Sequence, residues 1–247
     1  MEQFWASVQM FFQNLGQRLY DSFIYKDRYM YLVQGLGNTL LITLGAVLIG
    51  VILGTLVSLV RIVHSQNPKK LRFLNGICGL YLTIFRGTPM VVQLIIMYYI
   101  VFGAYRGDAL LVAVIAFGIN SGAYVAEVVR SGIQSVDRGQ TEAGRSLGLS
   151  NRTTMIKIVF PQAFKNVAPA IFNEFIALLK ETSVAGYIGI QDLTKGGDII
   201  RSITYDAYPA MLLVAAVYLI MVIGLTSVLS RLERRMHKGD KLSLIHI

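Results

Sequence analysis

The stretch from Leu36 to Val60 reads LGNTLLITLGAVLIGVILGTLVSLV and contains 25 residues without a charged side chain. An α-helix rises about 1.5 Å per residue, so about 20 apolar residues cross the hydrocarbon core of a bilayer. A helix buried in a soluble protein does not need so long an uncharged run. The stretch therefore predicts a membrane-spanning helix.

Four further stretches predict an all-α integral membrane protein with five transmembrane helices. Uncharged runs of 19 and 24 residues cover 87–105 and 207–230. The run 109–129 carries one charge, and the run 167–190 is interrupted by Glu174, Lys180 and Glu181. Only 15% of the 247 residues are charged, whereas soluble domains contain about 25%, so the composition agrees with a membrane protein.

The distribution of Lys and Arg predicts the orientation of the chain. With an external N-terminus, 15 of the 23 basic residues fall in the cytoplasmic segments 61–72, 130–165 and 231–241, and the external segments hold seven. Cytoplasmic loops of membrane proteins are enriched in basic residues, so the sequence predicts N-out and C-in. The net charge of +9 therefore does not indicate a nucleic-acid partner.

Two terminal segments flank the predicted transmembrane domain, which we place at 35–235. Within the N-terminal segment, 1–34, apolar residues at positions 5, 8, 12, 15, 19 and 23 follow the spacing of an amphipathic helix. Such a helix either lies flat at the outer membrane surface or packs on the bundle. The segment 236–247 is predicted to be a cytoplasmic tail, and its last six residues, 242–247, resemble a cloning or sequencing scar.

The sequence RGTP, at residues 86–89, predicts a break between two helices because Gly87 and Pro89 disfavour a continuous one. A helix from 73 to 105 would be about 50 Å long, which exceeds the bilayer core of about 30 Å. We expect 71–85 to lie along the membrane or dip into it, and the second span to begin after the break.

The residues that could carry chemistry exclude several classes of protein. There is one cysteine, Cys78, which is expected to be a small buried apolar residue, and three scattered histidines, so neither a disulfide nor a metal or cofactor site is predicted. The chain has no GxxxxGK[ST] phosphate loop and no HExxH motif. We therefore predict a transport subunit rather than an enzyme. An ion-driven secondary transporter or channel is the alternative, and a membrane-embedded enzyme is a third.

A polar segment at 141–161, TEAGRSLGLSNRTTMIKIVFP, interrupts the apolar chain. Asp137 can cap a first helix, with Gln140 completing a capping box. Gly148 can adopt the left-handed conformation that ends helices, and Ser150 can cap a second helix that ends at Pro161. Small residues at 143 and 144 would let another backbone come close. We call the segment 141–161, together with its cap at 137–140, the elbow, and expect 141–161 to dock on a cytoplasmic partner.

The elbow resembles the cytoplasmic EAA loop of binding-protein-dependent ABC transporter permeases. The family pattern is Glu-Ala-Ala, three residues, Gly, nine residues and Ile-x-Leu-Pro, and here it runs from Glu142 to Pro161 with the same spacing. Gly144 replaces the third residue of the pattern and Phe160 replaces its Leu. The stretches 35–44, 85–94, 120–149 and 173–190 are similar to the polar amino acid branch of that family, so the resemblance covers about 35–235.

This resemblance implies a type-1 permease subunit of an importer for polar L-amino acids in the bacterial inner membrane. It implies two permease chains, identical or different, two ABC ATPase subunits that hydrolyse ATP, and an extracytoplasmic amino-acid-binding protein. The elbow would be the coupling helix that sits in a groove of the ATPase. The expected coupling residues are Gln140, Thr141, Glu142, Ala143, Gly144, Arg145, Leu147, Gly148 and Pro161.

Polar residues at membrane depth are the candidates for a substrate path, because a charge near the bilayer centre costs about 2.5 to 3.5 kcal/mol. A zwitterionic amino acid needs acceptors for its ammonium and donors for its carboxylate, and the break at 86–89 is expected to expose backbone groups and a helix N-terminus. The same side chains could instead form hydrogen bonds between helices, and Glu127 could pair with Arg130. The candidates are Arg86, Gly87, Thr88, Asn120, Ser121, Tyr124, Glu127, Asn173, Glu174, Lys180, Thr182 and Ser183.

Overall fold

A computed structural model describes residues 1–236. For residues 2–4, 6–9, 11 and 12 it describes the backbone but not the side chains. The predicted tail, apart from residue 236, lies outside the described residues. Every regular element within 1–236 is helical, which confirms the all-α class. The α-helices are α1 (Glu2–Leu19), α2 (Tyr29–Gln66), α3 (Arg72–Gly87), α4 (Met90–Ile96), α5 (Ala109–Gln134), α6 (Arg138–Ser146), α7 (Asn151–Thr154), α8 (Phe160–Glu181), α9 (Leu193–Thr204) and α10 (Ala207–Met236).

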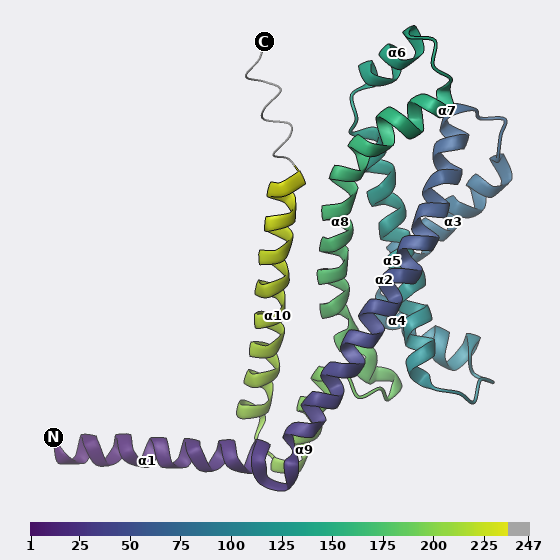
Figure 1. The fold of residues 1–247 in the computed structure, drawn as a ribbon. Coiled ribbons are helices and arrows are strands. Elements are labelled where there is room, and N and C mark those ends of the chain that lie inside the picture. The colour runs from purple at the N-terminus through teal and green to yellow at the C-terminus, as the bar shows by residue number, and fades with distance from the viewer. Residues whose placement is uncertain (237–247) are drawn as a thin grey trace.

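The centre of the fold is the crossing of α2 with α5 (Figure 1). Glycines bring the two backbones together: a Cβ atom on Gly54 would lie 2.7 Å from the carbonyl oxygen of Gly122 and 2.8 Å from the amide nitrogen of Ala126. Further along the same pair of helices, Ile42 and Phe117 are fully buried in a core that α8 also enters. Close packing through small residues is the usual way in which membrane helices associate.

Three helices in residues 1–236 are long and apolar enough to cross a membrane: α2, α5 and α10. A fourth crossing is possible if α3 and α4 act together as one bent span. The helix α8 has 22 residues but is too polar to qualify by composition. The structure therefore supports a multi-pass membrane protein, and the count of five spans stays a prediction.

The predicted break at 86–89 is confirmed, but the helix after it is shorter than the predicted second span, so a crossing here requires α3 and α4 together. The helices α3 and α4 meet at an angle of 111°. After the break, α4 and a π-helical turn, Met97–Val101, provide only 12 helical residues, from Met90 to Val101. That length is about 18 Å, which is too short to cross the bilayer core alone.

The predicted span at 167–190 is also corrected. The helix α8 begins earlier, at Phe160, and ends at Glu181, and a 3-10 segment, Thr182–Ile188, follows it. The expected external loop contains a helix of its own, α9. Asp192, which is fully buried, explains this local fold: its carboxylate caps α9 by accepting from Lys195 N at 2.8 Å and holds the 3-10 segment by accepting from Gly186 N at 2.9 Å.

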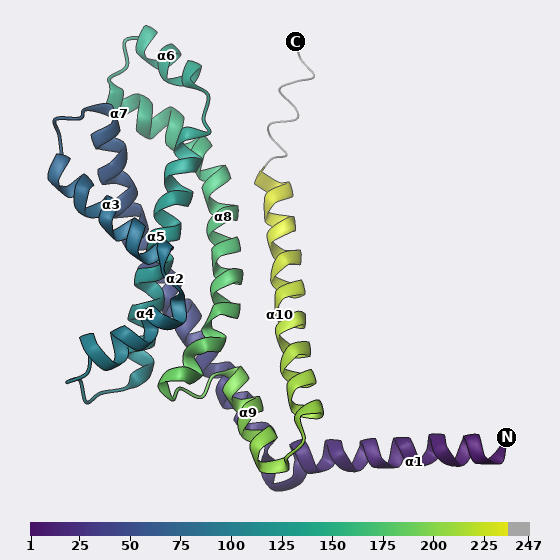
Figure 2. The same ribbon diagram turned by 180° about the vertical axis from the view of Figure 1, so that it is seen from behind.

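The amphipathic N-terminal helix is present as α1, and it is followed by a π-helical turn, Tyr20–Ile24. It extends sideways from the bundle instead of packing along it (Figures 1 and 2). The elbow and the C-terminal end of α10 lie at one end of the bundle, and α1 and α9 lie at the other (Figure 1).

Candidate functional site

The elbow forms the protruding tip of the bundle (Figure 1). As predicted, Asp137 caps α6 by accepting from the N–H of Gly139 at 2.6 Å, Gly148 has a left-handed φ of +78°, and Ser150 caps α7 by accepting from the N–H of Thr153 at 3.1 Å. The predicted capping box is incomplete, because the side chain of Gln140 accepts from Gln162 instead, at 3.2 Å. These caps fix where the two helices of the elbow begin.

The second helix of the elbow does not end at Pro161, so that prediction is wrong. The chain passes from α7 through a π-helical turn, Met155–Val159, into α8, and Pro161 lies in the first turn of α8. Proline has no N–H to donate to the preceding helical turn, and here it comes directly after the π-helical turn, where the regular α-helical bonding is already interrupted. The elbow is therefore joined to α8 by continuous helical backbone.

The small residue at 144 accommodates a side chain from within the elbow. A Cβ atom on Gly144 would lie 2.7 Å from Cγ2 and 2.9 Å from Oγ1 of Thr154, which is fully buried. The neighbour that comes close is thus a threonine of α7, whereas the sequence suggested another backbone. This contact packs α6 on α7 and accounts for glycine at the third position of the EAA pattern.

Gly144→Ala is expected to loosen the elbow, and Thr154→Ala in the same chain is expected to restore it. Overpacking typically costs 1–3 kcal/mol, whereas alanine gains about 1 kcal/mol over glycine in a helix. In Gly144→Ala, hydrogen exchange of the amides of residues 138–160 should therefore become faster, by up to about ten-fold if the elbow loses about 1.4 kcal/mol of stability. The double variant should exchange no faster than the wild type, and equal exchange in all three chains would refute the packing argument.

The outer surface of the elbow carries most of the predicted coupling residues. Glu142, Ala143 and Arg145 are exposed, and Leu147 exposes 79% of its surface. Thr141 is half-buried. An exposed leucine with charged side chains nearby matches the general layout of interfaces, which have an apolar centre and a polar rim.

The predicted path residues separate into two groups, and the larger one lies around the break. The guanidinium of Arg86 stands 5.7 Å from the ring centroid of Tyr124, and its Nη1 is 3.8 Å from Oε2 of Glu127. Glu127 also pairs with Arg130, whose Nε donates to Oε2 at 3.1 Å, which confirms the pairing considered from the sequence. Between α5 and α8, the hydroxyl of Ser121 donates to Oε1 of Glu174 at 3.0 Å and links the two helices.

The break is braced from inside the chain. The side-chain amide of Gln93 donates to the carbonyl oxygens of Phe85, at 2.9 Å, and Thr88, at 3.0 Å. Asn120 donates to the Phe85 carbonyl at 3.2 Å and to Oε1 of Gln93 at 2.8 Å. Within 86–89, the Thr88 carbonyl is therefore occupied by a side chain of the chain itself, whereas the expected exposure of the N-terminus of α4 stays a prediction. Asn120 acts here as a hydrogen-bonding brace, and Gln93, which the sequence analysis missed, is signalled only by being polar within an apolar run.

The second group of predicted path residues lies at the far end of α8. Thr182 is buried in the 3-10 segment and donates to the carbonyl of Leu179 at 2.8 Å. Lys180 and Ser183 line a cavity of about 320 Å³ between α8, α9 and α10. Asn173 is exposed on α8. The structure therefore does not bring Asn173, Lys180, Thr182 and Ser183 into the group around the break.

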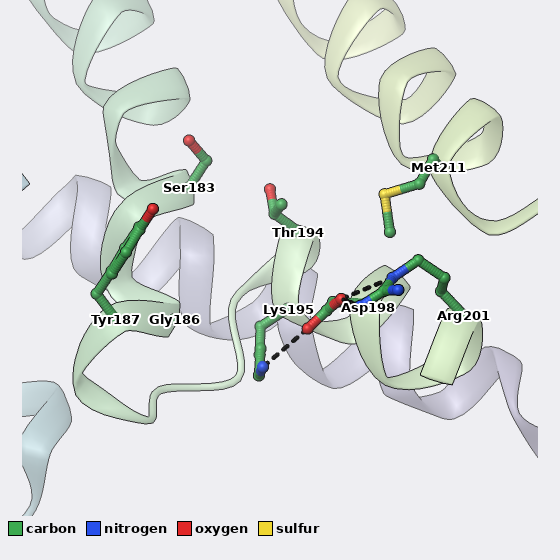
Figure 3. A pocket seen from close by; sticks show the side chains of 8 residues that line it. All are labelled: Ser183, Gly186, Tyr187, Thr194, Lys195, Asp198, Arg201 and Met211. Atoms are coloured by element: carbon green, nitrogen blue, oxygen red, sulfur yellow. Dashed lines mark hydrogen bonds and ion pairs between the residues drawn. The ribbon is translucent and has the colours of Figure 1, made fainter. Parts of the chain in front are cut away.

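A neighbouring cavity of about 360 Å³, which the sequence did not predict, shares Ser183 as a lining residue (Figure 3). Three charged side chains of α9 stand along its wall: Asp198 accepts from Lys195 Nζ at 2.9 Å and from Arg201 Nε at 2.9 Å. The hydrogen bonds from Lys195 and then Arg201 hold the pKa of Asp198 below its ordinary value. The triad keeps one net positive charge at neutral pH, so this wall favours an anionic group.

Comparison with known proteins places these features in a family. The model for "binding-protein-dependent transport system inner membrane component" matches residues 65–238. The arginine transport system permease protein ArtQ of Bacillus subtilis (strain 168) is 35% identical over 215 residues, covering 85% of this chain and 94% of that protein. The glutamine transport system permease protein GlnP of Escherichia coli (strain K12) is 34% identical over 208 residues, covering 83% and 92%.

Solved structures agree with the fold. A crystal structure of an amino acid ABC transporter with histidines superposes with a TM-score of 0.77 at 40% identity, covering 86% of this chain and 98% of that one. An inward-facing structure of the MetNI methionine ABC transporter superposes with a TM-score of 0.71, covering 84% and 96%. At 22% identity, the second likeness concerns the fold alone.

Proposed function

Because this chain belongs to the family of binding-protein-dependent transport system inner membrane components, we propose that it is the permease subunit of an ATP-powered importer of polar L-amino acids. The observation that carries the substrate class is the similarity, over more than four fifths of the chain, to permeases named for arginine and glutamine transport. The chain would provide the path, and a separate ABC ATPase would hydrolyse ATP.

The proposed topology has five membrane crossings with the N-terminus outside and the C-terminus inside the bacterial inner membrane. Support comes from the opposite ends of the bundle at which α1 and the elbow lie (Figure 1). It also comes from the concentration of basic residues on the elbow side. We assign 35–235 to the transmembrane domain, with 1–34 as an N-terminal segment and 236–247 as a cytoplasmic tail.

The elbow is the proposed coupling element. Its exposed residues, Glu142, Arg145 and Leu147, are held on two helices whose starts are fixed by side-chain caps. Because the elbow continues into α8 as helical backbone, a force on its tip would reach Glu174 without crossing a flexible loop. An ABC ATPase is the partner proposed for this surface.

The group around the break is the proposed inner part of the substrate path. Arg86, Tyr124 and Glu127 remain partly exposed although they belong to segments of membrane depth. Charged groups facing lipid would be costly, so these side chains are expected to face a water-filled path between this chain and a second permease. A guanidinium and a carboxylate together match the two charges of a zwitterionic amino acid. An extracytoplasmic binding protein would deliver the substrate from the opposite end.

Uptake into vesicles tests this function. The chain would be reconstituted with the ABC ATPase and the amino-acid-binding protein of its own genome, and uptake of radiolabelled polar amino acids would be measured with internal or external ATP. We expect uptake only when ATP is available to the ATPase side. Uptake that follows a proton gradient without ATP would replace the proposal with an ion-driven transporter.

Glu174→Ala tests the path in the same vesicles. Removing this carboxylate leaves Ser121 without its acceptor and is expected to reduce the initial rate of uptake at least about ten-fold, equivalent to 1.4 kcal/mol. Glu127→Ala should act in the same direction, and Ser121→Ala, which leaves the carboxylate in place, should act more weakly. Unchanged uptake by both glutamate variants, with unaltered folding, would eliminate these residues from the path.

A further inference from the structure

The helix α1 lies at the level at which α10 begins. Arg18, near the end of α1, forms an ion pair of 2.6 Å with Asp206, the residue directly before α10, and its guanidinium stands 5.8 Å from the ring centroid of Tyr208. Since α10 is apolar enough to span a membrane, its first turn marks one boundary of the bilayer. The ion pair therefore fixes α1 at that boundary, where it runs crosswise to α10 (Figure 2).

Exposed tyrosines surround the same level. Tyr20 and Tyr25 lie between α1 and α2, Tyr29 begins α2, and Tyr205 and Tyr208 flank the start of α10. Their exposed fractions range from 43% to 95%. Tyrosine and tryptophan concentrate where membrane meets water, because their rings are apolar and their edges polar. This tyrosine belt is a second indication, independent of the ion pair, that α1 lies at the membrane surface.

The surface of α1 is suited to that position. Trp5 exposes 65% of its surface, and Leu15 and Leu19 are exposed as well. The helix carries only two charged residues, Glu2 and Arg18. Its polar side is otherwise formed by uncharged amides, hydroxyls and small residues, so attraction to anionic lipids would contribute little.

An apolar cavity, which we call the niche, lies in the corner between α1 and α10. Its volume is about 330 Å³, and it is lined by Leu15, Arg18, Leu19, Phe23, Tyr208, Pro209, Leu212 and Leu213. The lining side chains are apolar except for the guanidinium and the tyrosine hydroxyl, which stand at the boundary level. Such a niche matches the upper part of a lipid acyl chain beneath its headgroup.

We propose that α1 is an interfacial anchor that lies in the plane of the membrane surface, with a phospholipid acyl chain in the niche between α1 and α10. The occupant is the bilayer itself, because the apolar side of α1, the tyrosine belt and the start of α10 share one level. The anchor would fix the depth and tilt of α10 and α2, whichever substrate the chain transports.

The chain contains a single tryptophan, Trp5, so its fluorescence reports on α1 without a label. Full-length protein would be placed in nanodiscs of zwitterionic lipid brominated near the glycerol or at the chain end, and iodide would probe water access. The expected results are stronger quenching by the shallow bromines than by the deep ones, and iodide quenching about three-fold weaker than for a free tryptophan analogue. Adding anionic lipid or salt should change neither.

Matched variants distinguish a bilayer around α1 from water or a second copy of the chain. The double variant Leu15→Glu and Leu19→Glu should increase the quenching of Trp5 fluorescence by iodide. The double variant Gln13→Glu and Asn14→Glu adds the same charge on the polar side of α1 and should leave the quenching unchanged. Strong iodide quenching of the wild type would show that α1 projects into water and would overturn the proposal. Shielding from both bromine and iodide would place α1 against a second copy of the chain and would overturn it as well.

Discussion

Leu147→Asp is expected to abolish retention of the ABC ATPase by this permease, while Leu147→Met retains it. The side chain exposes 79% of its surface at the tip of the elbow, so the substitution removes almost no packing within the chain. Burying a leucine in a partner is worth about 1.5–3 kcal/mol, and an aspartate in the same pocket would add the cost of a desolvated charge. A loss of at least about 3 kcal/mol corresponds to more than a hundred-fold weaker binding.

The measurement is co-purification in detergent of the tagged chain with amino acid ABC ATPases from its genome. Glu142→Lys serves as a second disruptive variant, because it reverses a charge on the same exposed surface. Thermal unfolding of each variant checks that the permease is intact. If all chains retain the ATPase equally, the elbow is not the coupling surface. If the wild type retains none of the candidates, the proposed dependence on an ATPase is wrong.

Gly54→Leu is expected to prevent folding, while Gly224→Leu is tolerated. At Gly54 a side chain would enter the backbone of α5, with the carbonyl of Gly122 at 2.7 Å and the amide of Ala126 at 2.8 Å. Backbone cannot move aside as a side chain can, so the cost should exceed the 1–3 kcal/mol typical of overpacking. At Gly224, on α10, nothing lies within 4 Å of the added Cβ atom.

The two variants make the same change in helix propensity, so their difference reports packing alone. The yield of monodisperse protein after extraction in mild detergent should fall at least about ten-fold for Gly54→Leu and stay close to the wild type for Gly224→Leu. Similar yields from both variants would mean that the close approach of α2 and α5 does not determine the fold.

Long apolar runs and helix caps were predictable from the sequence because both depend on local residue pattern. The run 36–60 lies inside α2, and Asp137, Gly148 and Ser150 perform the local roles that their types suggested. The helical break at 86–89 was predictable for the same reason, because glycine and proline interrupt a helix through the conformation of their own backbone.

Features that depend on distant neighbours were not predictable. The brace formed by Gln93 and Asn120 joins residues 27 positions apart, and the contact of Gly144 with Thr154 depends on how two short helices fold together. Helix α9 was missed because its stability depends on Asp192, which is buried only once the chain folds around it. The predicted span boundaries were inaccurate for a related reason. Hydropathy measures composition, whereas the bend of 111° and the 3-10 segment after α8 are set by packing.

The unbroken helix α2 has a mechanical consequence. Its 38 residues make a rod about 57 Å long, which exceeds the bilayer core. One end contacts the elbow through Gln66, whose side chain accepts from Asn151 at 3.2 Å. The other end lies beside the start of α9, where the side-chain amide of Gln191, two residues before α9, donates to the carbonyl of Tyr31 at 3.0 Å. A stiff lever of this length converts a tilt of about 5° into a displacement of about 5 Å at its far end. A displacement of side-chain size at one face therefore needs only a small tilt of α2 about its other end.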